Sequence, residues 1–98
     1  MPDFQSVSSD VKPVLIDFYA DWCGPCQTMI PIIKEMENLY RDKLQIVKID
    51  IETNQLISKQ YSIQSVPTFI LLYKNEIVWR AAGIQSRNDL RTQIDKLL

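Results

Sequence analysis

The chain contains no histidine and only two cysteines among its 98 residues. A zinc site normally needs four Cys, His or carboxylate ligands, so one chain of this composition does not complete such a site. Only a cluster shared between two chains would escape that limit. Lysine and arginine form no cluster, and a formal net charge of -1 gives no basic field for nucleic acid. Composition therefore argues against metal binding and nucleic-acid binding.

Long apolar runs are also missing. Stretches such as residues 14–18 and 69–73 are far shorter than the ~20 residues that cross a bilayer. Residues 1–5 carry neither the basic leader nor the apolar core of a secretory signal, so we expect a cytoplasmic protein, although a trimmed precursor would look the same. In a reducing cytosol, a lone cysteine pair is more often catalytic than structural.

Both cysteines lie in one short segment, Trp22-Cys23-Gly24-Pro25-Cys26. Cysteines at this spacing can close a disulfide without moving the rest of the fold, and between a strand and a helix the spacing indicates a redox-active dithiol. A bridge across so short a loop would stabilise the fold little. The pair is therefore predicted to serve chemistry.

Strand and helix signals alternate along the chain, which predicts an α/β fold in a single domain over residues 1–98. Strand patterns cover residues 14–19, 44–50, 68–73 and 76–81. From Cys26 onward, apolar residues recur at helical spacing, which predicts an amphipathic helix with its first turn at the cysteines and a kink at Pro31. Strand, helix and strand in this order imply a parallel pair of strands.

Two further helices and a hairpin complete the expected fold. A short helix is predicted over residues 54–60, and a C-terminal helix opens at Ser86, three residues before Asp89, as in a capping box. Lys74 and Asn75 form a two-residue connection between strand patterns, which predicts a hairpin turn. Met29, Met36 and Trp79 are assigned to the core.

The segment from Asp17 to Cys26 resembles the active-site strand and loop of thioredoxin, and the match extends to Pro31, Lys48, residues 66–68 and Gly83. The resemblance implies a thioredoxin-like fold, with a central mixed sheet of about four strands and helices on both faces. Only about a dozen residues precede the first strand pattern here. We therefore expect the family's first strand to be missing or vestigial, with a short helix carrying Phe4 and Val7 in its place.

The position of the cysteines suggests a different role for each. Cys23 lies at the start of a helix, where unpaired N–H groups and the helix dipole favour a thiolate, so it is the predicted nucleophile. Cys26, one turn later and expected to be more buried, is the predicted resolving thiol. Pro25 suits a first helical turn, and Gly24 lets the backbone approach closely.

Asp17 is the one charged residue within the first strand pattern. We interpret it as a proton acceptor for Cys26, because burial would raise its pKa toward the range of a working base. Lys48 on the neighbouring strand is its expected partner and would lower the same pKa. The alternative is a carboxylate that only hydrogen-bonds backbone groups.

Base rates and the resemblance predict different geometries for the peptide bond between Val66 and Pro67. Sequence alone favours a trans bond before Pro67. The resemblance implies a cis bond facing the dithiol and a Val66 backbone that pairs with an extended substrate segment. It also implies an apolar rim around a shallow substrate groove, formed by Trp22, Pro25, Ala82, Gly83 and Ile84.

The resemblance implies a thiol–disulfide oxidoreductase, specifically a general protein-disulfide reductase acting on disulfide-containing proteins. It also implies no bound cofactor and recharging by a thioredoxin reductase or another dithiol donor. We expect a monomer, although the sequence leaves the oligomeric state open. Relatives that act as oxidases or isomerases carry a histidine between the cysteines, so its absence favours the reductase direction. A disulfide oxidase or isomerase and a non-catalytic docking module or subunit remain alternatives, and the intact cysteines disfavour the docking role.

Overall fold

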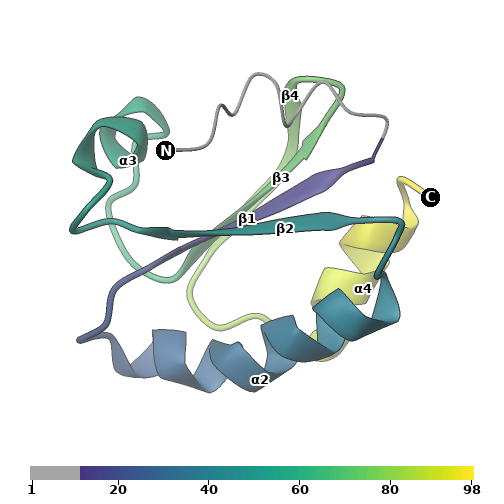
Figure 1. Cartoon of the computed structure of the whole chain (residues 1–98), viewed down its shortest axis with the longest axis horizontal. Coiled ribbons are helices and arrows are strands. Elements are labelled where there is room, and N and C mark those ends of the chain that lie inside the picture. Colours follow the sequence, from purple (N-terminus) through teal and green to yellow (C-terminus); the bar gives the residue numbers. More distant parts are fainter. Residues whose placement is uncertain (1–11) are drawn as a thin grey trace.

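A computed structural model describes residues 12–98, which form a four-stranded sheet in the order β2-β1-β3-β4 (Figure 1). The elements in chain order are β1 (Val14–Tyr19), α2 (Gly24–Leu39), β2 (Gln45–Asp50), α3 (Gln55–Gln60), β3 (Thr68–Tyr73), β4 (Glu76–Ala82) and α4 (Arg87–Asp95). The predicted α/β order is confirmed, with element ends shifted by a residue or two. The expectations for Phe4, Val7 and a missing first strand lie outside the described residues.

The central strand β1 pairs in parallel with β2 and antiparallel with β3, so the sheet is mixed as expected. This register sets Asp17 directly beside Lys48. β3 and β4 form the predicted hairpin, in which Lys74 and Asn75 have φ values of 53° and 67°. Positive φ at both central residues is the geometry of the favoured two-residue hairpin turn.

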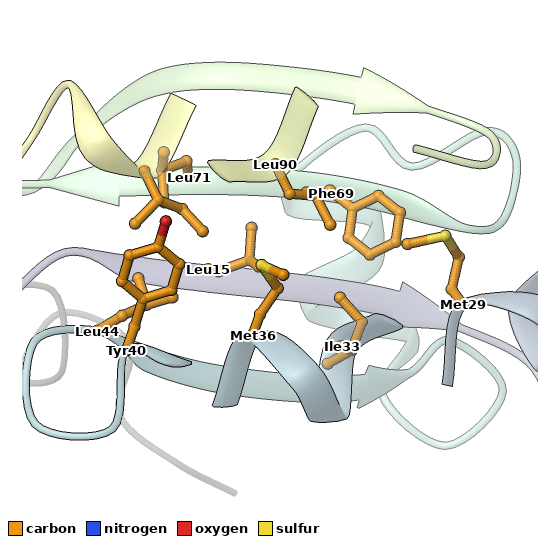
Figure 2. Packing of buried hydrophobic residues seen from close by; sticks show 10 residues of the cluster. Leu15, Met29, Ile33, Met36, Tyr40, Leu44, Phe69, Leu71 and Leu90 are labelled. Atoms are coloured by element: carbon orange, nitrogen blue, oxygen red, sulfur yellow. The ribbon is translucent and has the colours of Figure 1, made fainter. Parts of the chain in front are cut away.

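Helices cover both faces of the sheet: α2 and α4 lie on one face and α3 on the other (Figure 1). Side chains alternate along β1, so Leu15 packs with residues of α2 and α4 while Ile16 packs on the opposite face with Ile57 of α3. Figure 2 shows the first of these clusters, in which Met29 and Met36 are buried as predicted. Asp17, two residues after Leu15, shares its face of the sheet with α2.

Helix α2 starts at the cysteines, as predicted. Cys23 is the N-cap, and a proline occupies the first turn. The helix continues through Pro31 as one element, and the kink at that residue stays a prediction. The dithiol is therefore attached to the N-terminal end of a sixteen-residue helix.

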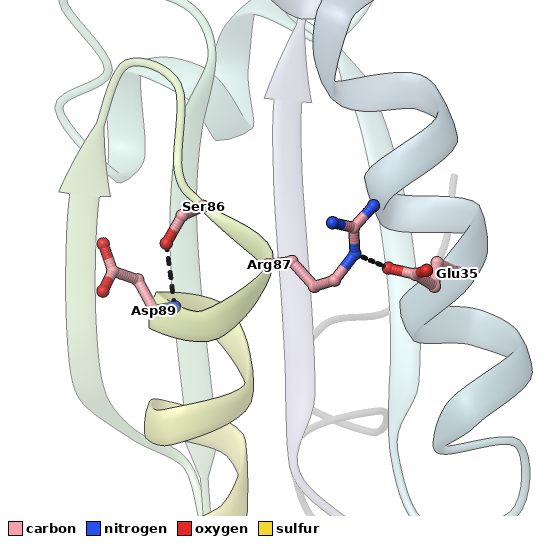
Figure 3. A network of polar contacts seen from close by, with 4 residues as sticks. All are labelled: Glu35, Ser86, Arg87 and Asp89. Carbon is pink, nitrogen blue, oxygen red and sulfur yellow. Dashed lines mark hydrogen bonds and ion pairs between the residues drawn. The ribbon is translucent and has the colours of Figure 1, made fainter.

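The other half of α2 is fastened to α4. Ser86 caps α4 by accepting a hydrogen bond from the Asp89 backbone N at 3.0 Å, and the next residue, Arg87, forms an ion pair with Glu35 of α2 (Figure 3). Near the end of α2, the Tyr40 hydroxyl donates to Asp95 Oδ1 at 2.7 Å. These contacts tie the helix that carries the dithiol to the rest of the core.

Candidate active site

A disulfide joins Cys23 and Cys26, whose Cα atoms are 5.2 Å apart. The backbone N–H of Cys26 donates to Cys23 Sγ at 3.1 Å, so the N-cap sulfur receives one of the unpaired donors of the helix start. When the pair is reduced, that donor and the helix dipole favour the thiolate of Cys23 over the thiol. This geometry suits Cys23 as the attacking sulfur.

The expectation that Cys26 is more buried than Cys23 is wrong for this oxidised form. Cys23 is 4% exposed and Cys26 is 6% exposed. Cys23 is covered because its sulfur lies 3.5 Å from the carbonyl oxygen of Val66, and both cysteines pack in one cluster with Ala20. The two sulfurs are distinguished by their places in the helix rather than by exposure.

A pocket of about 250 Å³ lies behind the disulfide and brings Asp17, Lys48 and Cys26 together. Its lining residues are Asp17, Tyr19, Asp21, Cys26, Gln27, Ile30 and Lys48. A water molecule takes up about 30 Å³ in the liquid, so the pocket is large enough for a short chain of waters. The predicted base and the predicted resolving cysteine thus share one small cavity.

Asp17 is buried, with 4% of its surface exposed. Within residues 12–98, its Oδ1 atom has no hydrogen-bond partner, which disfavours a carboxylate that only hydrogen-bonds backbone. Burial raises the pKa of Asp17 from 3.8 to about 6, and the positive charge of Lys48 opposes part of that rise. A carboxyl group in this range can both take up and release a proton near neutral pH.

Lys48 acts on Asp17 without a direct ion pair in the described part of the chain. Its Nζ atom lies 5.2 Å from the centre of the Tyr19 ring, in a cation–π arrangement. Sequence reasoning did not single out Tyr19, although its position two residues after Asp17 places it on the same face of β1. Tyr19 therefore lines the pocket and contacts Lys48, whose positive charge lowers the pKa of Asp17.

The segment around Pro67 adjoins the dithiol. The Val66–Pro67 bond is cis, as the resemblance implied. The Val66 carbonyl faces Cys23, and the Gly83 backbone N donates to the Pro67 carbonyl oxygen at 2.8 Å, with Gly83 at a φ of 87°. The expected rim residues Trp22, Pro25, Ala82 and Ile84 are exposed, Gly24 is exposed between the cysteines, and Gly83 is half-buried.

A family model described as Thioredoxin matches residues 3–96. The chain belongs to the thioredoxin family. A solved mutant thioredoxin from Halobacterium salinarum superposes with a TM-score of 0.87 at 35% identity, covering 96% of this chain and 81% of that structure. The predicted thioredoxin-like fold is confirmed.

Two curated relatives illustrate the range of the family. Thioredoxin from Bacillus subtilis is 38% identical over 96 residues, which span 96% of this chain and 92% of the relative. Thioredoxin Y from rice, described as chloroplastic, is 46% identical over 87 residues, or 89% of this chain and 52% of the relative. The chain thus spans about half the length of the plant relative. Membership of this family, with both cysteines intact, supports the expected thiol–disulfide oxidoreductase function and leaves the compartment open.

Two other features are not found in the part of the chain that the structure describes. Among residues 12–98, no helix has the length and apolar character needed to span a bilayer. The same residues contain no group of three or more His, Cys, Asp or Glu side chains arranged to hold a metal ion.

Sequence reasoning missed a second contact at this site, besides that between Lys48 and Tyr19. The indole Nε1 of Trp22 donates to Glu52 Oε1 at 2.6 Å. The two residues are 30 positions apart, and Glu52 follows the end of β2 in an exposed turn. Neither periodicity nor a local motif indicates such a pairing, because it depends on how the strand ends are placed side by side.

Proposed function

We propose that this chain is a general protein-disulfide reductase that works through a reversible Cys23–Cys26 dithiol and disulfide. One observation carries the proposal: the cysteine pair caps α2 and adjoins a pocket that also contains the buried Asp17. The nucleophile Cys23, the resolving thiol Cys26 and the proton acceptor Asp17 would then lie close together. Residues 1–98 are taken as one domain, which the family match over residues 3–96 supports.

In the first step, the Cys23 thiolate attacks one sulfur of a substrate disulfide. A new bond forms between Cys23 Sγ and that sulfur, and the other substrate sulfur leaves as a thiolate that takes up a proton. The N–H of Cys26 supports this assignment because it donates to Cys23 Sγ. Pro25 favours a helix start here, because its missing N–H costs nothing in the first turn. A Cβ at Gly24 would meet no atom within 4 Å among residues 12–98, so the close backbone approach expected at Gly24 does not occur within this part of the chain.

In the second step, Cys26 gives its proton to Asp17 and attacks Cys23 Sγ. The Cys23–Cys26 disulfide forms, the mixed disulfide breaks, and the second substrate sulfur leaves as a thiolate. The substrate disulfide has gained two electrons and the cysteine pair has lost two. Asp17 suits the transfer because its pKa lies at about 6, and Lys48 keeps that pKa from rising further.

Substrate would lie across the segments around Val66 and Gly83. The proposed groove is formed by Trp22, Val66, Pro67, Ala82, Gly83 and Ile84, next to Pro25. A backbone carbonyl and a rim of apolar side chains recognise an extended peptide with little regard to its sequence. This breadth suits a general reductase better than an enzyme with one substrate.

Electrons must come from outside the chain, because each turnover leaves Cys23 and Cys26 oxidised. We propose a thioredoxin reductase as donor, with no cofactor bound by the chain itself. A reducing compartment such as the cytoplasm suits the role, since both cysteines belong to the redox pair and none is left for a structural bridge. We further propose that the protein works as a monomer.

The test compares the turnover of a disulfide-bonded protein by the reduced wild type, Cys23→Ser and Cys26→Ser. Wild type should reduce the substrate, whereas Cys23→Ser should not. Cys26→Ser should trap the substrate on Cys23, seen as a mass increase that reductant removes. Equal rates for wild type and Cys23→Ser would refute the reductase assignment and favour a docking module, whose binding would ignore cysteine redox state.

The reduction potential of the pair separates a reductase from an oxidase or isomerase. We expect a strongly reducing value, because no histidine lies between the cysteines to stabilise the thiolate further. Equilibration with glutathione buffers of known ratio measures this potential. A strongly oxidising value would reverse the proposed direction of electron flow.

A further inference from the structure

Trp22 directly precedes Cys23, yet its side chain is 69% exposed. An exposed tryptophan would normally sample several side-chain rotamers. Here its indole Nε1 donates to Glu52 Oε1 at 2.6 Å. Because the acceptor is a carboxylate, this hydrogen bond belongs to the stronger, charge-assisted class. This hydrogen bond thus links the exposed indole beside the dithiol to a distant part of the chain.

Glu52 is itself held in a well-bonded turn. Its backbone N donates to Asp50 Oδ1 at 2.9 Å, and its carbonyl oxygen accepts from Gln55 Nε2 at 3.3 Å. The Asn54 backbone N donates to the Asp50 carbonyl oxygen at 3.0 Å. The carboxylate is therefore presented from the fixed end of β2 rather than from a free loop.

We propose that Glu52 is a positioning residue, which holds the Trp22 indole in place so that a protein disulfide docks against a preorganised apolar rim. The idea rests on the proposed reductase function. Ordering a side chain at the moment of binding costs affinity, and a hydrogen bond made beforehand removes that cost. The structure gives Glu52 no contact with either sulfur, so its effect should fall on substrate docking.

The first experiment measures steady-state reduction of insulin by the full chain, with dithiothreitol as the electron donor that recharges the cysteine pair and with the rate of dithiothreitol alone subtracted. It uses wild type, Glu52→Ala, Glu52→Gln and Glu37→Ala. Glu37 is an exposed glutamate on α2 outside the proposed site and serves as the matched control. Glu52→Ala should raise KM roughly threefold to tenfold, the range expected from one net hydrogen bond, with a smaller change in kcat. Glu52→Gln keeps an acceptor oxygen and should restore most of the loss.

A double-mutant cycle tests whether Glu52 acts through Trp22. Trp22→Phe removes the N–H donor but keeps an apolar ring, so it should raise KM by a similar factor. The combined Trp22→Phe/Glu52→Ala variant should then be little worse than either single variant. Additive losses, or a KM unchanged in Glu52→Ala, would overturn the proposal.

A spectroscopic measurement does not depend on activity. The chain has two tryptophans, so Trp79→Phe assigns the two indole N–H resonances in an NMR spectrum. In Glu52→Ala, the Trp22 resonance should shift and exchange faster with water, while Glu37→Ala should leave it unchanged. An unshifted resonance would overturn the proposal. A wild type that reduces no disulfide would refute the reductase function, and the resonance would still decide whether Glu52 holds Trp22.

Discussion

The two ends of α2 do opposite things. At the first turn, the helix carries two sulfurs above a pocket in which Asp17 Oδ1 has no hydrogen-bond partner within residues 12–98. Toward its last turn, Met36 is fully buried and the Tyr40 hydroxyl is bonded to Asp95. The site beside the first turn of α2 thus contains an unpaired polar atom, Asp17 Oδ1 of β1, whereas packing and hydrogen bonds are satisfied at the other end of the helix.

Chemistry therefore depends on the dithiol end of α2, and stability depends on its packed end. Buried polar groups are normally paired, and an unpaired one destabilises the fold unless it does something else. Changes at the site beside the first turn should therefore alter turnover, and replacing Asp17 of β1 should also stabilise the protein. Changes toward the last turn should lower stability and leave the dithiol chemistry of the folded protein intact.

The largest expected stability loss comes from Met36→Ala at the packed end. Met36 is fully buried in the cluster between α2, α4 and the sheet, so the substitution removes contacts and leaves a cavity (Figure 2). We expect the free energy of unfolding to fall by about 2–5 kcal/mol. Urea unfolding followed by circular dichroism measures the loss. Leu39→Ala, in the exposed part of the same helix, is the control and should change it little.

Asp17→Asn changes the site at the other end of α2. We expect it to raise the stability of the protein at pH 8 and to lower its reaction rate. Folding raises the pKa of Asp17 from 3.8 to about 6, so the folded state binds more protons within that window. Stability therefore falls as pH rises through it, by about 3 kcal/mol once the carboxyl is ionised in both states. The amide removes this penalty, so Asp17→Asn should be more stable than wild type at pH 8 and no more stable below pH 3.8.

The same substitution should slow release of substrate from the mixed disulfide by roughly tenfold to a hundredfold, because Cys26 loses its proton acceptor. Attack by Cys23 should change less. Urea unfolding at pH 8 and pH 3.5 tests the first effect, and stopped-flow measurement of the two steps tests the second. Asp21→Asn, an exposed carboxyl at the same pocket, is the control. Two unchanged rates at neutral pH would remove Asp17 from the mechanism.

Local patterns predicted the elements of this fold well, because strand and helix periodicities are properties of neighbouring residues. The buried strand around Asp17 and the helix start at Cys23 were both visible in the sequence. The position of Lys48 over the Tyr19 ring and the bond between Trp22 and Glu52 were not. Such contacts arise only when the sheet brings distant strand ends together, and a side chain's choice among several partners leaves no periodic signal.

Tyr40→Phe tests the packed end of α2 by removing one hydroxyl group. The ring stays and keeps its packing, while the hydrogen bond to Asp95 is lost. We expect a loss of about 1 kcal/mol in unfolding free energy, the usual net value of one hydrogen bond. Insulin reduction by the folded variant should match wild type. Tyr73→Phe is the control, because Tyr73 lies at the end of β3, away from the contact between α2 and α4. A stability loss larger than that of Met36→Ala would contradict the expected order of these effects.

The smallest effect is expected from Arg87→Ala, which breaks the ion pair with Glu35 (Figure 3). Both side chains are about half exposed, so solvent and salt screen their attraction. Arg87 also lies in the first turn of α4, where the helix dipole disfavours a positive charge, and its removal relieves that repulsion. That relief offsets part of the attraction lost in Arg87→Ala, but it cancels in the pairwise term of a double-mutant cycle with Glu35→Ala. Because solvent screens the pair, this pairwise term should be at most about 1 kcal/mol and should approach zero in 1 M salt. A larger, salt-independent term would mean that this contact stabilises α2 as strongly as the buried core does.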